Sequence, residues 1–346
     1  MGKERRKVSN LLVPVALIEK LAPHPNADAL ELAQVLGWQI VVKKDAYHVG
    51  QKVVYFPIDA ILPLEISERF GVTKYLSKQR IRCAKLRGEP SFGLVVEPDD
   101  ENWTIGQNMA EYYGATRYEP PVRPEAGDME KDHPLFQEYT EIENLRNYPD
   151  IFTPGEAVVL TEKVHGTNCR VGMIEGEMMA GSKSLRRKRP ENEQFARNIY
   201  WFPFHLAPVR SLLEELGSSH QQVILYGEVY GSKIQSLHYG LKERLGFRAF
   251  DLCIDGRYQD WPDFLALCQR YGVETVPIVA EIPFQMEEIK RLSNGPTLIM
   301  AQDAHLREGL VVKPVHEYSH PELGRVILKY VSDDYLFSKN TDYTDR

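Results

Sequence analysis

Short runs of hydrophobic and β-branched residues, broken by glycine and proline, fill the first third of the chain. Residues 30–35 alternate apolar and polar side chains, residues 38–42 are rich in strand formers, and Gly37 lies between the two runs. Further short strands are predicted at 11–18, 52–57, 58–62, 80–87 and 92–96. Closely spaced short strands predict a small β-barrel of the OB type, with a generic β-sandwich as the alternative.

The pattern changes after residue 141, where strand runs begin to alternate with longer amphipathic segments. Helices are predicted near 193–200, 207–217, 262–271 and 285–293. Strands are predicted at 157–161, 168–174, 177–181, 223–229, 248–254, 309–313 and 325–331. This mixture predicts a C-terminal α+β domain with antiparallel core sheets, so that the whole chain is an α+β protein with an N-terminal barrel.

A segment rich in proline and acidic residues separates the two regions. It carries Pro120, Pro121, Pro124 and Pro134, and proline cannot donate its backbone nitrogen to a helix or a sheet. We therefore predict a linker at 117–140 with little regular structure, between an N-terminal domain at 1–116 and a C-terminal domain at 141–346.

The composition is that of an ordinary globular protein, with 346 residues, 43% hydrophobic and 26% charged. No apolar run reaches the roughly 18 residues that span a bilayer, and the first residues lack the apolar core of a signal peptide. The four cysteines show no Cys-x-x-Cys spacing, so neither a zinc site nor a disulfide framework is predicted. We expect a cytoplasmic monomer with reduced cysteines and no membrane partner.

The net charge of −7 is unevenly distributed: it is +1 over residues 1–116, −6 over 117–156 and −2 over 157–346. Two basic runs stand out. Seven basic residues and no acidic residue lie between Arg69 and Gly88, and the second run comprises Lys183, Arg186, Arg187, Lys188 and Arg189. A basic run is either a solvated face or a surface for phosphates.

The segment 80–87 alternates basic with apolar residues. As a strand, it would place one set of side chains in the core and the other in solvent. We predict a cationic face for polynucleotide phosphates, formed by Arg80, Arg82, Lys85 and Arg87, with Arg186 and Arg187 as a second contact.

Lys163 stands at the end of a buried strand, before Gly166 and two small polar residues. A free lysine with a pKa of about 10.4 is about 0.1% deprotonated at neutral pH, so it needs desolvation or neighbouring cations to become a nucleophile. A solvated lysine at a strand edge is the alternative. The chain contains neither a P-loop nor a dinucleotide-binding glycine motif.

Five motifs follow one another along the chain: Lys-Val-His-Gly-Thr-Asn at 163–168, Gly-Glu at 227–228, Phe-Asp at 250–251, Glu-Gly-Leu-Val-Val-Lys at 308–313 and Ile-Leu-Lys at 327–329. Their order resembles the covalent nucleotidyltransferase superfamily of ATP-dependent ligases and capping enzymes. The first motif and the upstream barrel are similar to the RNA ligases with an N-terminal OB-type domain. The resemblance covers roughly residues 9–115 and 140–340.

This resemblance implies a nucleotide site around Lys163, which would attack ATP and carry AMP. It implies that Glu228 binds the ribose or the water shell of a metal, and that Glu308 binds Mg²⁺ or Mn²⁺. Lys329 would contact the α-phosphate. The remaining expected nucleotide contacts are Glu162, Gly166, Asn168, Lys183, Phe247, as the ring on adenine, and Lys313.

Two positions depart from the pattern of the family. Many relatives have aspartate at the position of His165, and since a neutral imidazole cannot replace that charge we assign His165 to the later steps. Several relatives have Lys-x-Lys where this chain has Lys329-Tyr330-Val331, so one phosphate contact is missing and Lys313 is expected to compensate.

The sequence therefore predicts an RNA ligase that seals 3′-OH and 5′-phosphate ends in nicked RNA or RNA/DNA duplex. It would act through lysyl-AMP and an AMP-capped 5′ end. A capping guanylyltransferase or a DNA ligase is the first alternative, although both usually carry an OB-type domain after the catalytic one, and few residues follow Lys329 here. A nucleic-acid-binding relative without catalytic activity is the second.

Overall fold

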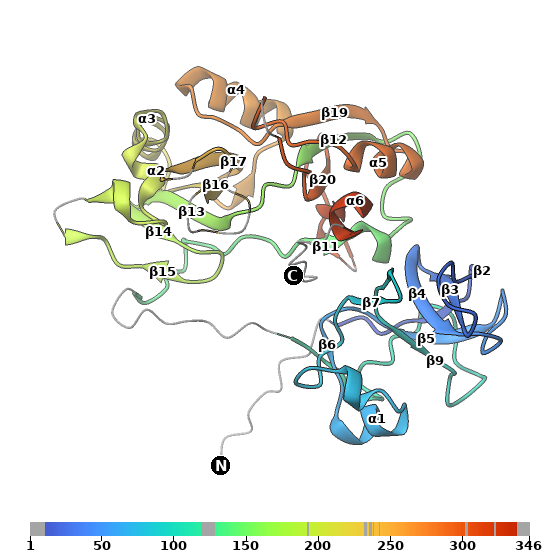
Figure 1. Ribbon diagram of the computed structural model, residues 1–346. Helices are drawn as coiled ribbons and strands as arrows, with labels where there is room; N and C mark the ends of the chain where they lie inside the picture. The colour runs from blue at the N-terminus through green and yellow to red at the C-terminus, as the bar shows by residue number, and fades with distance from the viewer. Residues whose placement is uncertain are drawn as a thin grey trace, which may run out of the picture. The chain divides into compact units, whose positions relative to one another are not determined.

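The computed structural model describes residues 11–118, 129–191, 194–231, 234, 237, 239–241, 243–301, 304–321 and 323–337. The chain divides after Val122 into two compact units (Figure 1). Part of the predicted linker, residues 119–128, lies outside the described residues. No helix in the described ranges is both long and apolar enough to cross a membrane.

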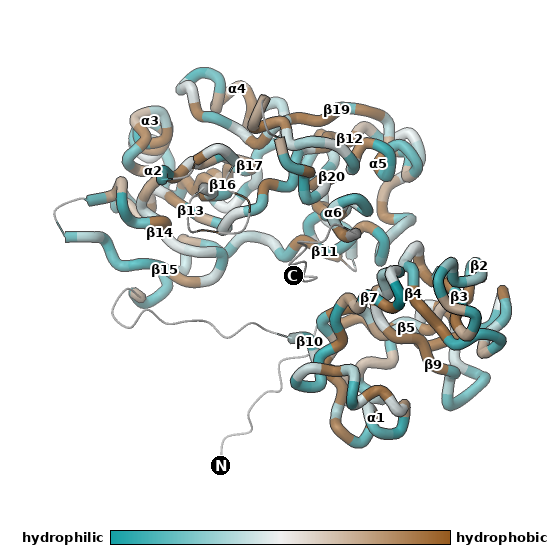
Figure 2. Tube along the Cα trace, viewed as in Figure 1, coloured by the Kyte–Doolittle hydropathy of each residue, from teal (hydrophilic) through white to brown (hydrophobic). Residues whose placement is uncertain are grey.

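The N-terminal unit is built from short antiparallel strands around a small core. One sheet has the order β1-β5-β9 and another the order β2-β3-β4. Its described strands are β1 (Val15–Leu17), β2 (Lys20–Pro23), β3 (Leu30–Val35), β4 (Trp38–Lys43), β5 (Lys52–Phe56), β6 (Ala60–Ile61), β7 (Ala84–Leu86), β8 (Glu89–Ser91), β9 (Leu94–Val96) and β10 (Thr116–Arg117). Figure 2 shows how hydrophobic residues concentrate along strands such as β5.

Helix α1 (Leu64–Arg69) and the 3₁₀ turn η1 (Thr73–Tyr75) lie between β6 and β7 in the chain. Leu36 and Gly37 join β3 to β4 with positive φ angles of 50° and 72°. Two consecutive residues with positive φ form the turn that matches the twist of a hairpin. The two runs predicted on either side of Gly37 therefore form a hairpin, with β3 and β4 paired along their length.

The predicted strand at 80–87 is wrong in its first half. Only Ala84–Leu86 is a strand, paired with Glu89–Ser91. The guanidinium of Arg80 instead donates to the buried carboxylate of Asp59 at 2.7 Å and lies 3.7 Å from the ring centroid of Tyr118. A buried carboxylate needs a partner, and this requirement overrides the alternation that predicted Arg80 in solvent.

The C-terminal unit contains two larger sheets. The five-stranded sheet has the order β11-β23-β20-β12-β19, and the six-stranded sheet the order β15-β14-β13-β16-β17-β18. The pairs are antiparallel apart from β11 with β23. The strands are β11 (Glu143–Asn144), β12 (Ala157–Glu162), β13 (Thr167–Ile174), β14 (Glu177–Gly181), β15 (Arg186–Arg187), β16 (Gln222–Gly231), β17 (Leu245–Ile254), β18 (Arg257–Tyr258), β19 (Ile278–Pro283), β20 (Gly309–Pro314) and β23 (Leu328–Val331), with the short pair β21 (Ser319–His320) and β22 (Gly324–Arg325).

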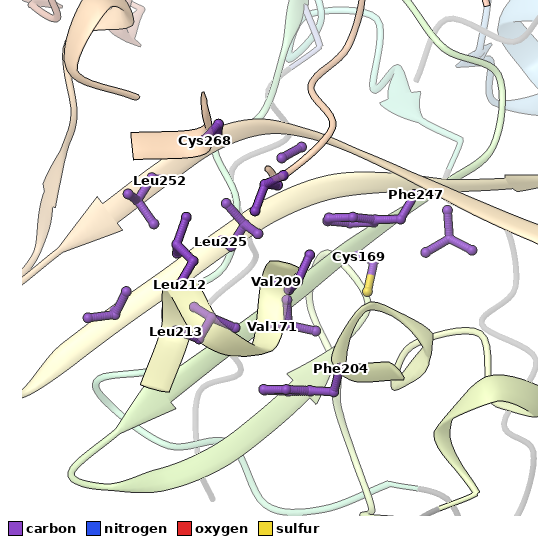
Figure 3. Close-up of a cluster of buried hydrophobic side chains, with 14 of the residues drawn as sticks. Cys169, Val171, Phe204, Val209, Leu212, Leu213, Leu225, Phe247, Leu252 and Cys268 are labelled. Atoms are coloured by element: carbon purple, nitrogen blue, oxygen red, sulfur yellow. The ribbon is translucent and has the colours of Figure 1, made fainter. Parts of the chain in front are cut away.

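Helices cover one face of the six-stranded sheet, where α3 packs against β13 and β16 (Figures 1 and 3). The helices are α2 (Phe202–His205), α3 (Ala207–Gly217), α4 (Trp261–Tyr271), α5 (Met286–Ser293) and α6 (Asp333–Phe337), with η2 at Leu145–Asn147. Only a 3₁₀ turn, Phe195–Arg197, occurs where a helix near 193–200 is predicted, and residues 192–193 lie outside the described residues.

The other face of the six-stranded sheet is covered by chain without regular structure. Residues 131–142 form neither helix nor strand, yet Phe136 and Tyr139 are buried against Tyr226 and Ile224 of β16. Two aromatic side chains thus seal this face of the sheet. Because of this packing, the segment just before residue 141 belongs to the core of the C-terminal unit.

Candidate active site

Lys163 follows β12 and remains attached to the five-stranded sheet. Its backbone N–H donates to the carbonyl of Gly309 at 2.9 Å, next to β20. The preceding residues 158–162 are buried, whereas 28% of the Lys163 side chain is exposed. The strand therefore carries one amine from the core to a position that a ligand can reach.

Glu308 holds the side chains of Lys163 and His165 together. Lys163 Nζ donates to Glu308 Oε1 at 2.6 Å, and His165 Nδ1 lies 3.0 Å from Oε2. Burial opposes ionisation of Glu308, but the nearby Lys163 and His165 outweigh it and lower its pKa to about 2. The carboxylate is therefore charged at neutral pH, with both oxygens engaged.

Glu228 is the second carboxylate of the cluster, and its pKa is shifted in the opposite direction from that of Glu308. Burial raises its pKa to about 8, and the charge of Glu308 adds to this effect, while Lys163 and a hydrogen bond from the backbone of Gly166 oppose it. Two carboxylates near one amine thus differ in protonation at neutral pH: Glu308 is ionised and Glu228 is largely protonated.

Gly166 allows the turn after Lys163 to pass close to β16. A Cβ atom at this position would lie 2.3 Å from the carbonyl oxygen of Val229 and 2.9 Å from the Glu228 side chain. Any larger residue would push the turn away from Glu228. The glycine in the motif is therefore required by the approach of two backbones.

Asn168 contributes a buried acceptor that has no partner in the described part of the chain. It lies opposite Glu228 in the pairing of β13 with β16, so both side chains point to the same face. Its Oδ1 atom is buried and accepts no hydrogen bond from a described residue. Buried polar atoms are rarely left unpaired, so this acceptor indicates a place for a donor of a ligand.

Lys329 reaches the same face of the five-stranded sheet through the strand register. It pairs with Val311 on β20, which in turn pairs with Thr161, two residues before Lys163. Opposed residues share a face, and so do residues two apart along a strand. The buried Lys329 therefore belongs to the row of side chains next to Lys163.

Comparisons with known proteins agree with this arrangement. Residues 156–331 match the model of the RNA ligase family, and residues 12–98 match an OB-fold domain. The chain belongs to the RNA ligase family. No match is found among curated proteins.

Solved structures of an RNA ligase from Naegleria gruberi resemble the whole chain. A mutant with AMP and Mn is 25% identical, covering 94% of this chain and 98% of that chain with a TM-score of 0.75. An apo mutant is 26% identical, covering 94% and 97%, also with a TM-score of 0.75. The predictions of an RNA ligase and of an OB-type domain before an α+β domain are confirmed.

One residue that supports the turn after Lys163 in this RNA ligase, Tyr239, escapes sequence reasoning. The backbone N–H of His165 donates to the hydroxyl oxygen of Tyr239 at 2.7 Å, across 74 residues of sequence. Tyr239 is buried beside Val164 and Tyr230. Its segment carries no motif, so the only signal in the sequence was an aromatic residue in a loop.

Glu162 is placed differently from the prediction of a nucleotide contact. It is buried, and its carboxylate accepts from Thr297 Oγ1 at 2.5 Å and from the backbone N–H of Leu298 at 2.7 Å. It therefore holds the loop at 297–298 against the end of β12. Together with the Tyr239 contact, this fixes the backbone on both sides of Lys163.

The contacts of Lys313 hold its amine against Asp251 and Trp261 and do not place it beside Lys163. Its amine forms a buried ion pair with Asp251 at 2.5 Å and lies 4.7 Å from the Trp261 ring centroid. Arg325 pairs with the same carboxylate at 3.0 Å and with Glu317 at 2.5 Å. The expectation that Lys313 replaces the missing phosphate contact finds no support, because a buried carboxylate already holds its charge.

The two phenylalanines lie on opposite faces of the six-stranded sheet. Phe247 is 3% exposed and packs among the helix-side core residues (Figure 3). Phe250 is the extra residue at a bulge where Tyr226 pairs with Asp251 and Gly227 with Ala249. Phe250 packs instead with Tyr139 and Tyr226, on the face that also carries Glu228. Phe247, the residue expected to pack on adenine, therefore lies on the face opposite Glu228, and Phe250 lies on the same face as Glu228.

The second basic run is largely paired within the C-terminal unit. Lys183 forms an ion pair with Glu141, Arg186 pairs with Glu130 at 2.9 Å, and Arg187 lies 4.7 Å from the Tyr200 ring centroid. Lys188 and Arg189 are exposed. The contacts given for Lys183 do not bring it to Lys163.

The first basic run is exposed in the β7–β8 hairpin. Arg82, Lys85 and Arg87 are all exposed, and none pairs with an acidic residue within the described ranges. The hairpin is held next to its turn, because His24 Nε2 lies 3.0 Å from the carbonyl oxygen of Leu86, the last residue of β7. Three of the four predicted cations are therefore available to a ligand, and Arg80 is not.

Proposed function

We propose that this RNA ligase joins a 3′-OH to a 5′-phosphate at a nick, with Lys163 as the residue that carries AMP. The observation that supports the proposal is the contact of the Lys163 amine with Glu308, in a cluster that also contains Glu228 and the orphaned oxygen of Asn168. The related Naegleria ligase has been solved with AMP and Mn and with PPi. These are the products and the metal expected of adenylyl transfer from ATP.

In the first step the Lys163 nitrogen attacks the α-phosphorus of ATP. A P–N bond forms, the bond to the bridging oxygen breaks, and pyrophosphate leaves. The ion pair with Glu308 favours the protonated amine in the free enzyme, and a protonated amine has no lone pair to attack with. ATP binding must therefore draw Glu308 away from Lys163 before the reaction.

The carboxylates Glu308 and Glu228 suit Mg²⁺ or Mn²⁺, which prefer oxygen ligands. Within the described residues, no group of three or more His, Cys, Asp and Glu side chains could hold a metal ion alone. Two carboxylates fit a metal that is shared with substrate phosphates and water. When bound, such an ion supplies positive charge that stabilises the developing charge on the phosphates.

The other side chains of the face bind and orient the nucleotide. Lys329 would neutralise the α-phosphate, and Asn168 Oδ1 would accept from a ribose hydroxyl or the terminal nucleotide. Phe250 would pack on adenine. We keep His165 for the later steps, because its ring already faces Glu308. In these steps the 5′-phosphate attacks lysyl-AMP, and the 3′-OH then displaces AMP.

The N-terminal unit would bind the polynucleotide through the exposed cations Arg82, Lys85 and Arg87 of the β7–β8 hairpin. Their charges suit phosphates of nicked RNA or RNA/DNA duplex. Arg186 and Arg187 would have to exchange their present contacts for RNA. A monomer in the cytoplasm is part of the same proposal.

Mass spectrometry after incubation with ATP and Mg²⁺ tests the assignment of the nucleophile. The adduct should lie on Lys163 and disappear in Lys163→Ala, while Lys290→Ala, a surface lysine on α5, keeps it. Radiolabelled GTP should give no adduct; a GTP adduct would favour a capping-type activity. A full-strength ATP adduct on another lysine would contradict the proposal.

A further inference from the structure

Segment 72–80 of the N-terminal unit exposes a tyrosine among cations. Tyr75, at the end of η1, is 71% exposed, the highest value among the large hydrophobic residues described as exposed. Lys74 Nζ lies 5.0 Å from its ring centroid, and Lys78 is exposed three residues on. Tyr75 therefore offers an open aromatic face beside two cations.

The segment is fixed from beneath, so the ring is presented by an ordered loop. Val72 and Leu76, on either side of η1, pack against the core of the unit. The buried hydroxyl of Ser67 lies 2.9 Å from the Thr73 hydroxyl and 2.8 Å from Gln79 Oε1. Both ends of the loop are thus tied to α1.

Lys78 stands at the tip of a strained turn. Lys78 and Gln79 adopt positive φ angles of 54° and 61°, which side chains other than glycine rarely adopt, and the N–H of Arg80 donates to the carbonyl of Ser77 at 3.2 Å. The turn holds the lysine outward, away from the carboxylate of Asp59 that captures Arg80. Strained backbone of this kind is maintained where surrounding contacts over-determine it.

The charge around Tyr75 is uncompensated. Arg69 pairs with Asp99 and Arg80 with Asp59, but Lys74, Lys78 and Arg82 pair with no acidic residue in the described part of the chain. Tyr112 provides the contrast: it is 58% exposed in the same unit, and its neighbour Asp99 is an acid. Of these two exposed tyrosines, Tyr75 is the one whose neighbouring cations have no acidic partner among the described residues.

We propose that Tyr75 is a stacking platform for an unpaired base of the RNA substrate, with Lys74 and Lys78 on the adjoining phosphates. Every base offers a π face, so stacking on an aromatic side chain tolerates any sequence, and nearby cations follow the backbone. A base inside a duplex has both faces covered, which restricts the platform to an unpaired or end nucleotide. The inference rests on the proposed function and adds a single-strand contact to it.

The test measures the affinity of the full-length enzyme for a fluorescein-labelled ten-nucleotide oligouridylate and for the same strand with abasic nucleotides. Tyr75→Ala should weaken binding of the intact strand roughly tenfold, and Tyr75→Phe should not, because stacking needs the ring and not the hydroxyl. On the abasic strand the same change should have little effect. Lys78→Gln should weaken both strands and reduce the salt dependence.

Tyr112→Ala is the matched control and should leave the affinity unchanged. Binding by Tyr75→Ala within twofold of the unaltered enzyme overturns the inference, as does an equal loss on the abasic strand, which would mean that the loop contacts only phosphates. Lysyl-AMP formation should be normal in all four variants. If the unaltered enzyme forms lysyl-AMP and only the Tyr75 prediction fails, the proposed function stands without the platform.

Discussion

Glu308 is the residue on which the free state of the site depends. Its two carboxylate oxygens contact Lys163 and His165, the two residues that the motif places on either side of Val164. The same carboxylate stabilises the charged amine and is a proposed metal ligand. It cannot serve both at full strength, so ligand binding and amine activation are coupled at one side chain.

Glu308→Gln should therefore slow lysyl-AMP formation. The substitution keeps the shape and removes the charge, and such electrostatic groups contribute about 10²–10³ in rate. Lys329→Ala should have an effect of similar size through the α-phosphate. Single-turnover adenylylation with labelled ATP measures both. Near-normal adenylylation by Lys329→Ala would remove Lys329 from the phosphate site.

Tyr239→Phe tests whether the buried hydroxyl of Tyr239 positions the turn that follows Lys163. Removing it leaves the His165 N–H without its acceptor, and we expect lysyl-AMP formation to slow about tenfold. Sealing of RNA that already carries the AMP cap bypasses the lysine step and should change less. Tyr230→Phe, in the same buried cluster, is the control. Equal losses in both steps would mean that Tyr239 acts only on stability.

At the scale of elements, a buried ion network joins strands of the two sheets. Asp251 on β17 accepts from Lys313 on β20 and Arg325 on β22, and the Tyr139 hydroxyl donates to it. Burial opposes the charge on Asp251, but Arg325 and Lys313 together lower its pKa to about 2. The network therefore connects β17, which carries Phe250, to β20 and β22, which follow Glu308 in the chain.

Lys313→Met should lower the free energy of unfolding by about 3 kcal/mol, because it leaves a buried carboxylate with one cation fewer. The double change Lys313→Met, Asp251→Asn should recover much of the loss. Urea unfolding at pH 7 measures both. If folded Lys313→Met also forms lysyl-AMP normally, Lys313 has no part in phosphate binding.

The pH dependence of this network follows from the pKa of Asp251. Because the folded value is below the usual value of 3.8, the stabilisation is present above about pH 4 and is lost as the pH falls toward 2. The stability difference between the unaltered enzyme and Asp251→Asn should shrink across that window. A difference that stays constant down to pH 2 would contradict the assigned ionisation.

At the scale of the whole molecule, the chain combines two units with separate cores. The motifs of the nucleotide site all lie in the C-terminal unit, whereas the exposed basic hairpin lies in the N-terminal unit. If each unit keeps its own chemistry, adenylylation and polynucleotide binding are separable.

Removing residues 1–116, or introducing Arg82→Glu with Lys85→Glu, should leave lysyl-AMP formation largely intact and reduce sealing of a nicked duplex. The charge-reversal loss should become smaller at high salt, which screens binding by the unaltered enzyme as well. Arg210→Glu, on the exposed surface of α3, is the control for charge alone. Equal loss of both activities would mean that the N-terminal unit has a structural role only.

The sequence by itself determined the elements with strong local signals and the order of the motifs. The predicted helix at 207–217 coincides with α3, and the strand at 177–181 with β14. Lys163, Gly166 and Glu228 meet as their motif order implies, because a strand end, a glycine turn and an antiparallel partner leave little choice of geometry. Local hydrophobic periodicity and backbone sterics suffice for these features.

Only the tertiary structure decided which partner each buried charge takes and which face each aromatic residue occupies. Arg80 and Lys313 went to Asp59 and Asp251, since a buried carboxylate costs more unpaired than a lysine or arginine gains in solvent. Phe247 packs in the helix-side core of the six-stranded sheet, and Phe250 packs with Tyr139 and Tyr226 on its other face. Such outcomes depend on residues distant in sequence, which no local pattern contains.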